Sequence, residues 1–433
     1  PQWFGGAKID WLDYNKHECN WFSGEYGDFC DEVGYREPYI NPGEPCNSNE
    51  EFQVLSLRCL QLGGLSPSIP PEVALLPSLS IIKISQSDVR APLSGLLPSE
   101  LLQLERLTEL ELQDNSLTGH IPSEIGSLSN LQFLWLDDNS LSGAIPSELG
   151  GLSSLIGLYL DGNSLSGSIP TEIASLTKLW ELRLHYNSLS GHIPSELGEL
   201  SRLKLLGLDH NSFSGYIPKE LMLESLWKLD LSENSLSGRI TSHVGILSSL
   251  RELKLHSNSL SGDIPTQLGR MSALGELDLH ANSFSGVIPS QLGTLSLGIL
   301  YLHSNSLRGS MPSELGMLDE LRELDLSNLP ALSGAIPTEL WELSGLVQLN
   351  FSGCGGLSGT FPKSICFLGS EACVFSDWWL DTKTTCSFDF DCSSKLCGCD
   401  CGCSSASMQE TASPADNSTD QGSTVLVVIP FDP

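Results

Sequence analysis

The stretch LKLHSNSLSGDIP, from Leu253 to Pro265, decides the fold because its pattern recurs along the chain. The copies follow the frame LxLxxNxLxGxIPxxLGxLxxL or a close variant, spaced 24 residues apart and twice 23. A fixed period of this length predicts a stack of repeated units rather than one globular core. The asparagine of the frame occurs at Asn115, Asn139, Asn163, Asn187, Asn211, Asn234, Asn258, Asn282 and Asn305.

Strand and turn geometry gives each recurring residue a part in the scaffold. The two leucines of LKL alternate toward the same face of a short strand, so we expect both to point inward. Asn258 is expected to turn inward next and to hydrogen-bond backbone groups that the turn leaves unpaired. Gly262 permits a tight bend, Ile264 fills the core, and Pro265 fixes the backbone angle without needing a donor. Residues 266–274 then cross the other side as short helical or 3-10 turns.

One repeat cannot bury its leucine face alone, so the repeats have to stack. The array therefore predicts an α/β solenoid, a right-handed leucine-rich-repeat superhelix with a concave parallel β-sheet and disulfide-rich caps at both ends. At roughly 4.8 Å per repeat, about 12 to 13 repeats give a length of about 60 Å. We assign an N-terminal cysteine cap to 1–53, the solenoid to 54–362, a cysteine-rich C-terminal cap to 363–403, and an acidic tail rich in Ser and Thr, ending in a β-strand, to 404–433.

Composition narrows the class of partner. The chain has 53 acidic and 22 basic residues, a net charge of -31, which argues against a nucleic acid or an anionic membrane as partner.

No catalytic or phosphate-binding motif occurs, so we expect no enzyme activity and no cofactor. No apolar run is long enough to span a bilayer, so no membrane span is expected in this chain. We take Pro1 to follow a removed signal peptide or a cut in the chain.

The 13 cysteines lie only toward the two ends of the chain. Such placement predicts disulfide-pinned caps in an oxidising compartment, and hence a secreted or cell-surface protein. The Cys-x-Cys run that ends at Cys403 also has the spacing of a metal-binding segment, although disulfides are favoured in a secreted chain. The cysteines expected to form disulfides are Cys19, Cys30, Cys46, Cys59, Cys354, Cys366, Cys373, Cys386, Cys392, Cys397, Cys399, Cys401 and Cys403, an odd number that leaves one without an intrachain partner.

The motif NSLSGxIPxELGxLxxL, over roughly 54–362, resembles the plant-type leucine-rich-repeat family. The family's N-terminal cap, a Cys-x-Trp segment followed by a second cysteine, is similar to ECNWFSGEYGDFCD at Glu18–Asp31, and the resemblance implies a Cys19–Cys30 pair. Residues 33–49 are longer than the simple cap, and we expect Cys46 to pair with Cys59, which would tie the cap to the first strand. The resemblance implies secreted or cell-surface recognition: receptor ectodomains, inhibitors of wall-degrading enzymes, or ice binders.

Variable positions of the strand are expected to point outward from the concave sheet, because strand side chains alternate. Aromatic residues gather there beside carboxylates, and exposed aromatics on a rigid sheet are typical anchors for a partner and also suit sugar stacking. The alternative is that these aromatics merely fit a strand face. The candidate ligand-binding residues are Phe133, Trp135, Asp137, Asp138, Tyr159, Asp161, Arg183, His185 and Tyr186.

Three histidines, His256, His280 and His303, occupy one position of three successive repeats, about 5 Å apart. Adjacent imidazoles suit a shared soft metal ion or a pH sensor. Glu276 and Asp278 are close enough in the sequence that we expect them to raise the pKa values of these histidines. The alternative is a solvated polar column inherited through repeat duplication.

Serine follows most of the frame asparagines, and regular rows of small hydroxyls could order water as an ice binder does. The alternative is that serine is simply a good turn residue. Because Leu or Phe stands two residues after each frame asparagine, only Asn350 and Asn417 are glycosylation acceptors. The serines are Ser116, Ser140, Ser164, Ser188, Ser212, Ser235, Ser259, Ser283 and Ser306.

The tail ends in TVLVVIPFDP, a strong strand signal. Such a strand on a tether could pair with an exposed sheet edge and give self-association. Two main functions follow: an extracellular module that binds a protein, peptide or glycan on its concave face, or a subunit of an extracellular matrix or filament assembled through this tail; ice binding is a third. The residues of the assembly strand are Val425, Leu426, Val427, Val428 and Ile429.

Overall fold

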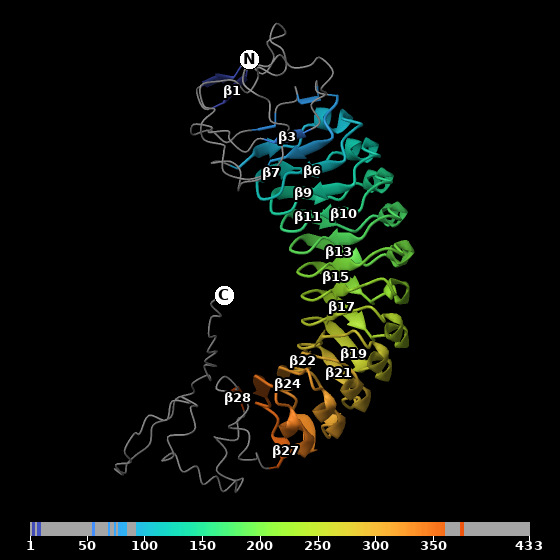
Figure 1. Ribbon diagram of the computed structural model, residues 1–433, viewed down its shortest axis with the longest axis vertical. Helices are drawn as coiled ribbons and strands as arrows, with labels where there is room; N and C mark the ends of the chain where they lie inside the picture. Colours follow the sequence, from blue (N-terminus) through green and yellow to red (C-terminus); the bar gives the residue numbers. More distant parts are fainter. Residues whose placement is uncertain are drawn as a thin grey trace, which may run out of the picture. The chain divides into compact units, whose positions relative to one another are not determined.

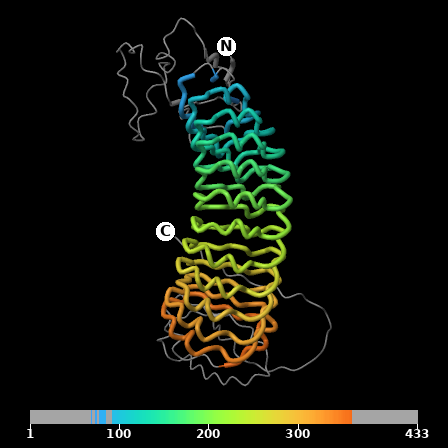
Figure 2. The backbone as a smooth tube through the Cα atoms, turned by 90° about the vertical axis from the view of Figure 1, so that its right-hand side faces the viewer, coloured from blue at the N-terminus to red at the C-terminus, as the bar shows by residue number. Residues whose placement is uncertain are grey.

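The repeats fold as coils that stack on one another along a curve, with short helices on the convex side (Figure 1), and the tube view in Figure 2 shows successive coils lying side by side. The chain divides into two units, residues 1–390 and 391–433, and the second lies outside the described residues. This computed structural model describes residues 2–4, 7–9, 54–56, 68–69, 73–74, 77–84, 92–359 and 373–375.

A parallel sheet of 14 strands lines the concave side, one strand from each coil. Its register places equivalent residues beside one another, so that Leu158 pairs with both Leu134 and Leu182. The last strand lies within 363–403, the segment predicted as a cap. In order along the sheet the strands are β3 (Val54–Ser56), β4 (Ile81–Lys83), β6 (Glu109–Glu111), β8 (Phe133–Trp135), β10 (Gly157–Tyr159), β12 (Glu181–Arg183), β14 (Leu205–Gly207), β16 (Lys228–Asp230), β18 (Glu252–Lys254), β20 (Glu276–Asp278), β22 (Ile299–Tyr301), β24 (Glu323–Asp325), β26 (Gln348–Asn350) and β28 (Cys373–Phe375).

A second parallel sheet, which was not predicted from the sequence, is built from the SLSG segments. Its nine strands are β5 (Ser94–Leu96), β7 (Ser116–Gly119), β9 (Ser140–Ala144), β11 (Ser164–Gly167), β13 (Ser188–His192), β15 (Ser212–Gly215), β17 (Ser235–Gly238), β19 (Ser259–Asp263) and β21 (Ser283–Ser285). Three further strands pair separately: β23 (Arg308–Gly309), β25 (Ala331–Ala335) and β27 (Gly356–Ser358). Elsewhere β1 (Gln2–Phe4) and β2 (Ala7–Ile9) form an antiparallel pair.

Short 3-10 helices carry the chain across the convex side. Most begin directly after the proline of the repeat, as η11 does after Pro265 with its φ of -67°, because proline supplies a helix-compatible φ where no N–H is needed. None of the helices in the described part of the chain is both long and apolar enough to cross a membrane. The helices are η4 (Ser99–Gln103), η5 (Ser123–Ser127), η6 (Ser147–Gly151), η7 (Thr171–Ser175), η8 (Ser195–Glu199), η9 (Lys219–Leu221), η10 (Ser242–Ile246), η11 (Thr266–Arg270), η12 (Ser290–Thr294), η13 (Ser313–Met317) and η14 (Thr338–Glu342).

The core is the continuous leucine column that the repeat predicts. Leu253, Leu255, Leu260 and Ile264 are all buried in their coil. The side chains on either side of the strand leucine are half-buried, so the variable positions face the concave side as expected. Because each coil buries its leucines against the coils above and below, the stack holds the outward columns in fixed register.

The frame asparagines close the turn after each main-sheet strand. Asn258 Nδ2 donates to the carbonyl oxygens of Leu231 at 2.9 Å and His256 at 3.1 Å, and its Oδ1 accepts from the Leu236 N–H at 2.9 Å. The bend that follows needs Gly262, whose φ is +81° and where a Cβ would lie 2.8 Å from Arg239 Nε. The predicted roles of this asparagine and glycine are therefore confirmed.

Cys354 occupies the frame position of the asparagine in a late repeat. Its buried Sγ donates to the Leu326 carbonyl oxygen at 3.0 Å, the bond that an asparagine amide makes in the other coils. The other predicted disulfide cysteines have side chains outside the described residues, so the predicted pairings stay predictions.

Candidate ligand-binding face

Three aromatic side chains of the predicted area form a stack on the concave sheet. Phe133 and Trp135 come from β8, and their ring centroids are 4.9 Å apart. Tyr159, on the neighbouring strand β10, stacks on Trp135 with centroids 5.4 Å apart and planes 6° from parallel. We call Phe133, Trp135 and Tyr159 the aromatic stack. The predicted gathering of these three residues is confirmed by their contacts.

Gly157 makes room for the aromatic stack, a role that was not predicted. A Cβ at this position would lie 2.6 Å from Cε2 of Tyr159 and 3.0 Å from Cδ1 of Phe133. The Tyr159 hydroxyl donates to Glu181 Oε2 at 3.1 Å, and Arg183 Nη2 donates to the same oxygen at 2.9 Å. The absence of a side chain at Gly157 thus leaves space for the rings, and the hydrogen bond to Glu181 holds Tyr159 against the next coil.

Tyr186, predicted to join this area, contacts a different ring. Its side chain is 55% exposed, and its ring stacks on His210 with centroids 4.0 Å apart. The reason is local: Tyr186 precedes the frame asparagine Asn187 with a left-handed φ of 50°, whereas Trp135 and Tyr159 lie on strands. The turn therefore directs this tyrosine away from the strand columns.

Asp137 and Asp161 occupy the same position in successive coils, just after β8 and β10. The Oδ1 atom of each is buried and has no hydrogen-bond partner among the described residues. Burial and the charge of Asp161 raise the pKa of the Asp137 carboxyl to about 7. Burial also raises the pKa of Asp161, although His185, whose Nε2 lies 3.2 Å from Asp161 Oδ2, acts in the opposite direction. Asp138, also predicted for this site, is exposed.

The three histidines form a stacked column, as their spacing predicts. Ring centroids are 4.4 Å apart for His256 and His280, and 4.2 Å apart for His280 and His303. The expected net rise of their pKa values is wrong for two of them, because burial outweighs the carboxylates. Burial lowers the pKa of both His256 and His303, and the neighbouring His280 adds to this, although Asp278 acts in the opposite direction.

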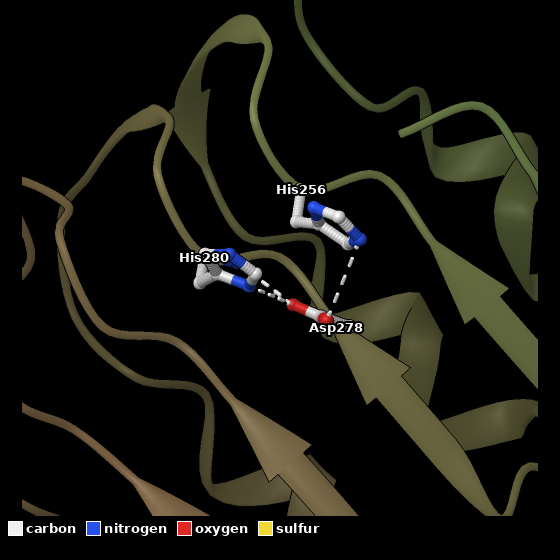
Figure 3. A group of neighbouring side chains, drawn as sticks. All are labelled: His256, Asp278 and His280. Atoms are coloured by element: carbon white, nitrogen blue, oxygen red, sulfur yellow. Dashed lines mark hydrogen bonds and ion pairs between the residues drawn. The ribbon is translucent and has the colours of Figure 1, made fainter. Parts of the chain in front are cut away.

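A carboxylate joins two of these histidines into a group that could hold a metal ion. His280 Nδ1 lies 2.6 Å from Asp278 Oδ1, and His256 Nε2 lies 3.9 Å from Asp278 Oδ2 (Figure 3). Glu276 is held elsewhere, because its Oε1 pairs with Lys254 Nζ at 2.9 Å. His303, the third predicted member, stacks on the column but is not part of the group.

A second exposed aromatic feature was missed in the sequence. Trp180 and Trp227 are 48% and 47% exposed, and Lys204 Nζ lies 5.2 Å and 4.1 Å from their ring centroids. The Arg251 guanidinium carbon lies 5.6 Å from the Trp227 ring. All four residues directly precede a main-sheet strand. The signal in the sequence is a tryptophan or a basic residue at the same position of four successive repeats.

The remaining predicted sites fall on the second sheet or beyond the described residues. The frame serines after Ser116 are exposed from Ser140 to Ser306, on or beside the second sheet rather than on the concave face. Asn350 donates from Nδ2 to Asp325 Oδ2 at 2.9 Å, and its glycosylation stays a prediction. Asn417 and the assembly strand at 425–429 lie outside the described residues, so the matrix or filament alternative also stays a prediction.

Comparison with known proteins places this geometry in a family. The sequence profile described as leucine-rich repeat region matches residues 109–236, and the leucine-rich-repeat profile matches residues 249–271 and 273–295. No curated protein sequence matched the chain.

Solved structures that resemble this chain include leucine-rich-repeat proteins. The Arabidopsis receptor kinase HAESA ectodomain, in complex with an IDA peptide hormone, is 32% identical with a TM-score of 0.61 over 71% of this chain and 55% of that one. The Leptospira interrogans leucine-rich-repeat protein LIC12759 is 30% identical, with a TM-score of 0.59 over 75% and 82%. A plant ice-binding protein is 32% identical, with a TM-score of 0.50 over 57% and 80%.

The chain spans about half the length of the plant receptor ectodomains that it matches. It covers 55% of a TDR receptor and 53% of the plant peptide hormone receptor RGFR1, which was solved in complex with RGF2. Its repeat frame, its coil geometry and its identity to a leucine-rich-repeat protein over most of that protein's length agree with one another. The chain therefore belongs to the leucine-rich-repeat family, in its plant type.

Proposed function

We propose that this chain is an extracellular recognition protein that binds a peptide on its concave face. A cationic group of the peptide, such as an Arg or Lys side chain, lies against Asp137 and Asp161, and an apolar part of the peptide lies against the aromatic stack. The observation that carries this proposal is the pair of buried, unpartnered carboxylate oxygens beside three stacked rings.

The carboxylates support a cationic ligand because Asp137 has no ion-pair partner among the described residues, and Asp161 pairs with one imidazole, that of His185. Two carboxylates in successive coils repel each other, and burial removes the water that would otherwise solvate them. A buried acceptor without a partner costs about 1–3 kcal/mol. A ligand ammonium or guanidinium group beside Asp137 and Asp161 would offset their charge.

The aromatic stack favours a peptide over a glycan. Sugar stacking needs an open ring face, but the faces of Trp135 and Tyr159 are partly covered by each other. Phe133 covers more of Trp135, and the Arg183 guanidinium carbon lies 5.1 Å from the Tyr159 ring centroid. What remains toward the concave side is suited to side-chain contact at ring edges.

The comparisons support a peptide as the ligand class. The matched HAESA ectodomain is a complex with a peptide hormone, and the matched receptor RGFR1 is a complex with RGF2. A rigid parallel sheet that presents columns of variable residues offers an extended chain several side-chain sites in a row.

The test is selection of binders from a random displayed peptide library against the full chain. We expect the enriched peptides to share an Arg or Lys, and their affinity to fall about tenfold or more for Trp135→Ala. Trp227→Ala is the control, because it removes an exposed tryptophan outside the aromatic stack. Enriched peptides without a cationic residue, or peptides bound equally by Trp135→Ala, would overturn the proposal.

Ice binding is a second candidate, favoured by the register of the second sheet. Ser166 pairs with Ser188, and Ser190 pairs with Ser212, so hydroxyls recur at every coil. On the same sheet, Ser214 Oγ donates to the carbonyl oxygen of Gly191 in the preceding coil. A similar plant protein is an ice-binding protein. Such a row of hydroxyls could order water at the spacing of the coils.

Inhibition of ice recrystallisation by the full chain tests this candidate. We expect activity in the wild type, its loss when Ser188→Tyr and Ser212→Tyr are combined, and its retention in Trp135→Ala. A wild-type chain without activity, or a double variant as active as wild type, would reject the second sheet as an ice-binding surface.

A further inference from the structure

Two histidines and an aspartate converge at the carboxyl ends of two neighbouring strands. Asp278 ends β20, and His280 follows it by two residues; His256 follows β18 in the same way. The register pairs Lys254 with Asp278, which brings the two imidazoles side by side. One ligand atom of each residue lies within 4.8 Å of the others (Figure 3).

The donor set suits a first-row transition-metal ion. Two imidazole nitrogens and one carboxylate oxygen are the three protein ligands of many zinc sites, with a fourth position left for another group. Asp278 is only 5% exposed, so its charge is poorly solvated, and a divalent cation would neutralise it more fully than two imidazoles do. The half-buried His256 and His280 leave the group within reach of solvent.

The three ligand atoms, which lie within 4.8 Å of one another, would have to move closer together to hold such an ion. Ligand atoms around a tetrahedral zinc lie about 3.4 Å apart, given metal–ligand distances of roughly 2.0–2.2 Å. The 3.9 Å between His256 Nε2 and Asp278 Oδ2 is close to this. The 2.6 Å between His280 Nδ1 and Asp278 Oδ1 is a hydrogen bond, and it would lengthen when the ion replaces the shared proton.

His303 belongs to the histidine stack but not to the group of metal ligands. Its ring continues the stack, 10° from parallel with that of His280. However, its Nδ1 lies 3.7 Å from Asp325 Oδ1, and that carboxylate already accepts the Ser327 N–H at 2.8 Å. Asp278 Oδ1 likewise accepts the His280 N–H, but the other oxygen of Asp325 also accepts from Asn350 Nδ2 at 2.9 Å. The stack therefore extends over three coils, whereas the ligand group involves only two.

We propose that His256, Asp278 and His280 bind one divalent transition-metal ion of the Zn²⁺ class. The fourth coordination position faces the concave side, where a carboxylate or imidazole of a partner could complete it. This site lies several coils away from the aromatic stack along the sheet and does not depend on the proposed peptide binding.

The experiment is calorimetric titration of the full chain with Zn²⁺, comparing wild type with His280→Ala, His256→Gln and the control His303→Ala. We expect one binding site to weaken about tenfold or more in the first two variants and to persist in His303→Ala. His256→Gln keeps a polar side chain in a half-buried position, so it tests the site even where His280→Ala unfolds.

Cobalt spectroscopy assigns the ligands, because the cysteine-rich segments of the same chain could also bind metal. The site lost in the variants should give Co²⁺ absorption bands without the strong near-ultraviolet bands of thiolate ligands. Titrations that are identical in all four proteins, thiolate bands from the lost site, or an equal loss in His303→Ala would each overturn the proposal and leave a structural histidine stack.

Discussion

Trp135 and Tyr159 lie 24 residues apart in the sequence, yet their rings stack with centroids 5.4 Å apart and planes 6° from parallel. The contact follows from the scaffold, because the sheet pairs Trp135 directly with Tyr159 while Leu134 packs beside Leu158 in the core. Each outward column is thus a continuous surface assembled from single residues of successive coils. The proposed binding face uses two such columns, one aromatic and one carboxylate.

The space at Gly157 gives the first prediction. In Gly157→Val the added side chain would collide with the rings of Tyr159 and Phe133, so the aromatic stack should be displaced. We expect a changed near-ultraviolet circular dichroism spectrum and about tenfold weaker binding of library-selected peptides. Gly275→Val is the matched control, since its nearest neighbour is the Arg251 carbonyl oxygen at 3.7 Å and no ring is in the way. Equal spectra and affinities for the two variants would contradict the role of Gly157.

The raised pKa of Asp137 predicts a pH-dependent stability. With its folded-state pKa at about 7, above the ordinary value of 3.8, the carboxyl lowers stability progressively as pH rises from about 4 to 7. Asp137→Asn should therefore raise the thermal unfolding midpoint, and by more at pH 8 than at pH 5. Asp138→Asn makes the same charge change at an exposed position and should show a smaller difference between the two pH values. A gain that does not depend on pH would contradict the burial of this charge.

The frame asparagines predict where the scaffold is most sensitive. Asn305 is buried, its Oδ1 accepts the Phe284 N–H at 2.9 Å, and its Nδ2 donates to the Leu279 carbonyl oxygen at 3.0 Å. Asn305→Ala leaves these groups unpaired, so we expect a loss of about 3 kcal/mol in the free energy of unfolding, measured by denaturant titration. The exposed neighbour Ser306 is the control, and Ser306→Ala should cost under about 0.5 kcal/mol. Similar losses for both would argue against the asparagine ladder as a main source of stability.

The repeat period made the scaffold predictable. Leucine, asparagine, glycine and proline recur in one frame, and each has a single physical role that stacking repeats in every coil. The alternation at Leu253 and Leu255 and the turn hydrogen bonds of Asn258 were therefore correct. The second sheet was not foreseen, because serine and glycine favour turns and the SLSG segments become strands only when neighbouring coils supply backbone partners.

The candidate sites were less predictable, because they depend on side-chain direction and burial. The sequence placed His256, His280 and His303 in a column, but only the structure shows that Asp278 contacts the first two. The wrong direction predicted for the histidine pKa values has the same origin: charges are visible in a sequence, whereas burial is not. Tyr186 likewise left the aromatic area because of a left-handed turn that its residue type does not favour.

The central claim is that Asp137 receives a cationic group of a peptide, and a double-mutant cycle tests it most directly. Calorimetry would give the affinity of one library-selected peptide and of its citrulline or acetyl-lysine counterpart for wild type and for Asp137→Asn. We predict that neutralising the peptide weakens binding to wild type about tenfold but has little effect on the variant, a coupling of about 1.4 kcal/mol. Equal losses in both proteins, with no coupling, would contradict the claim.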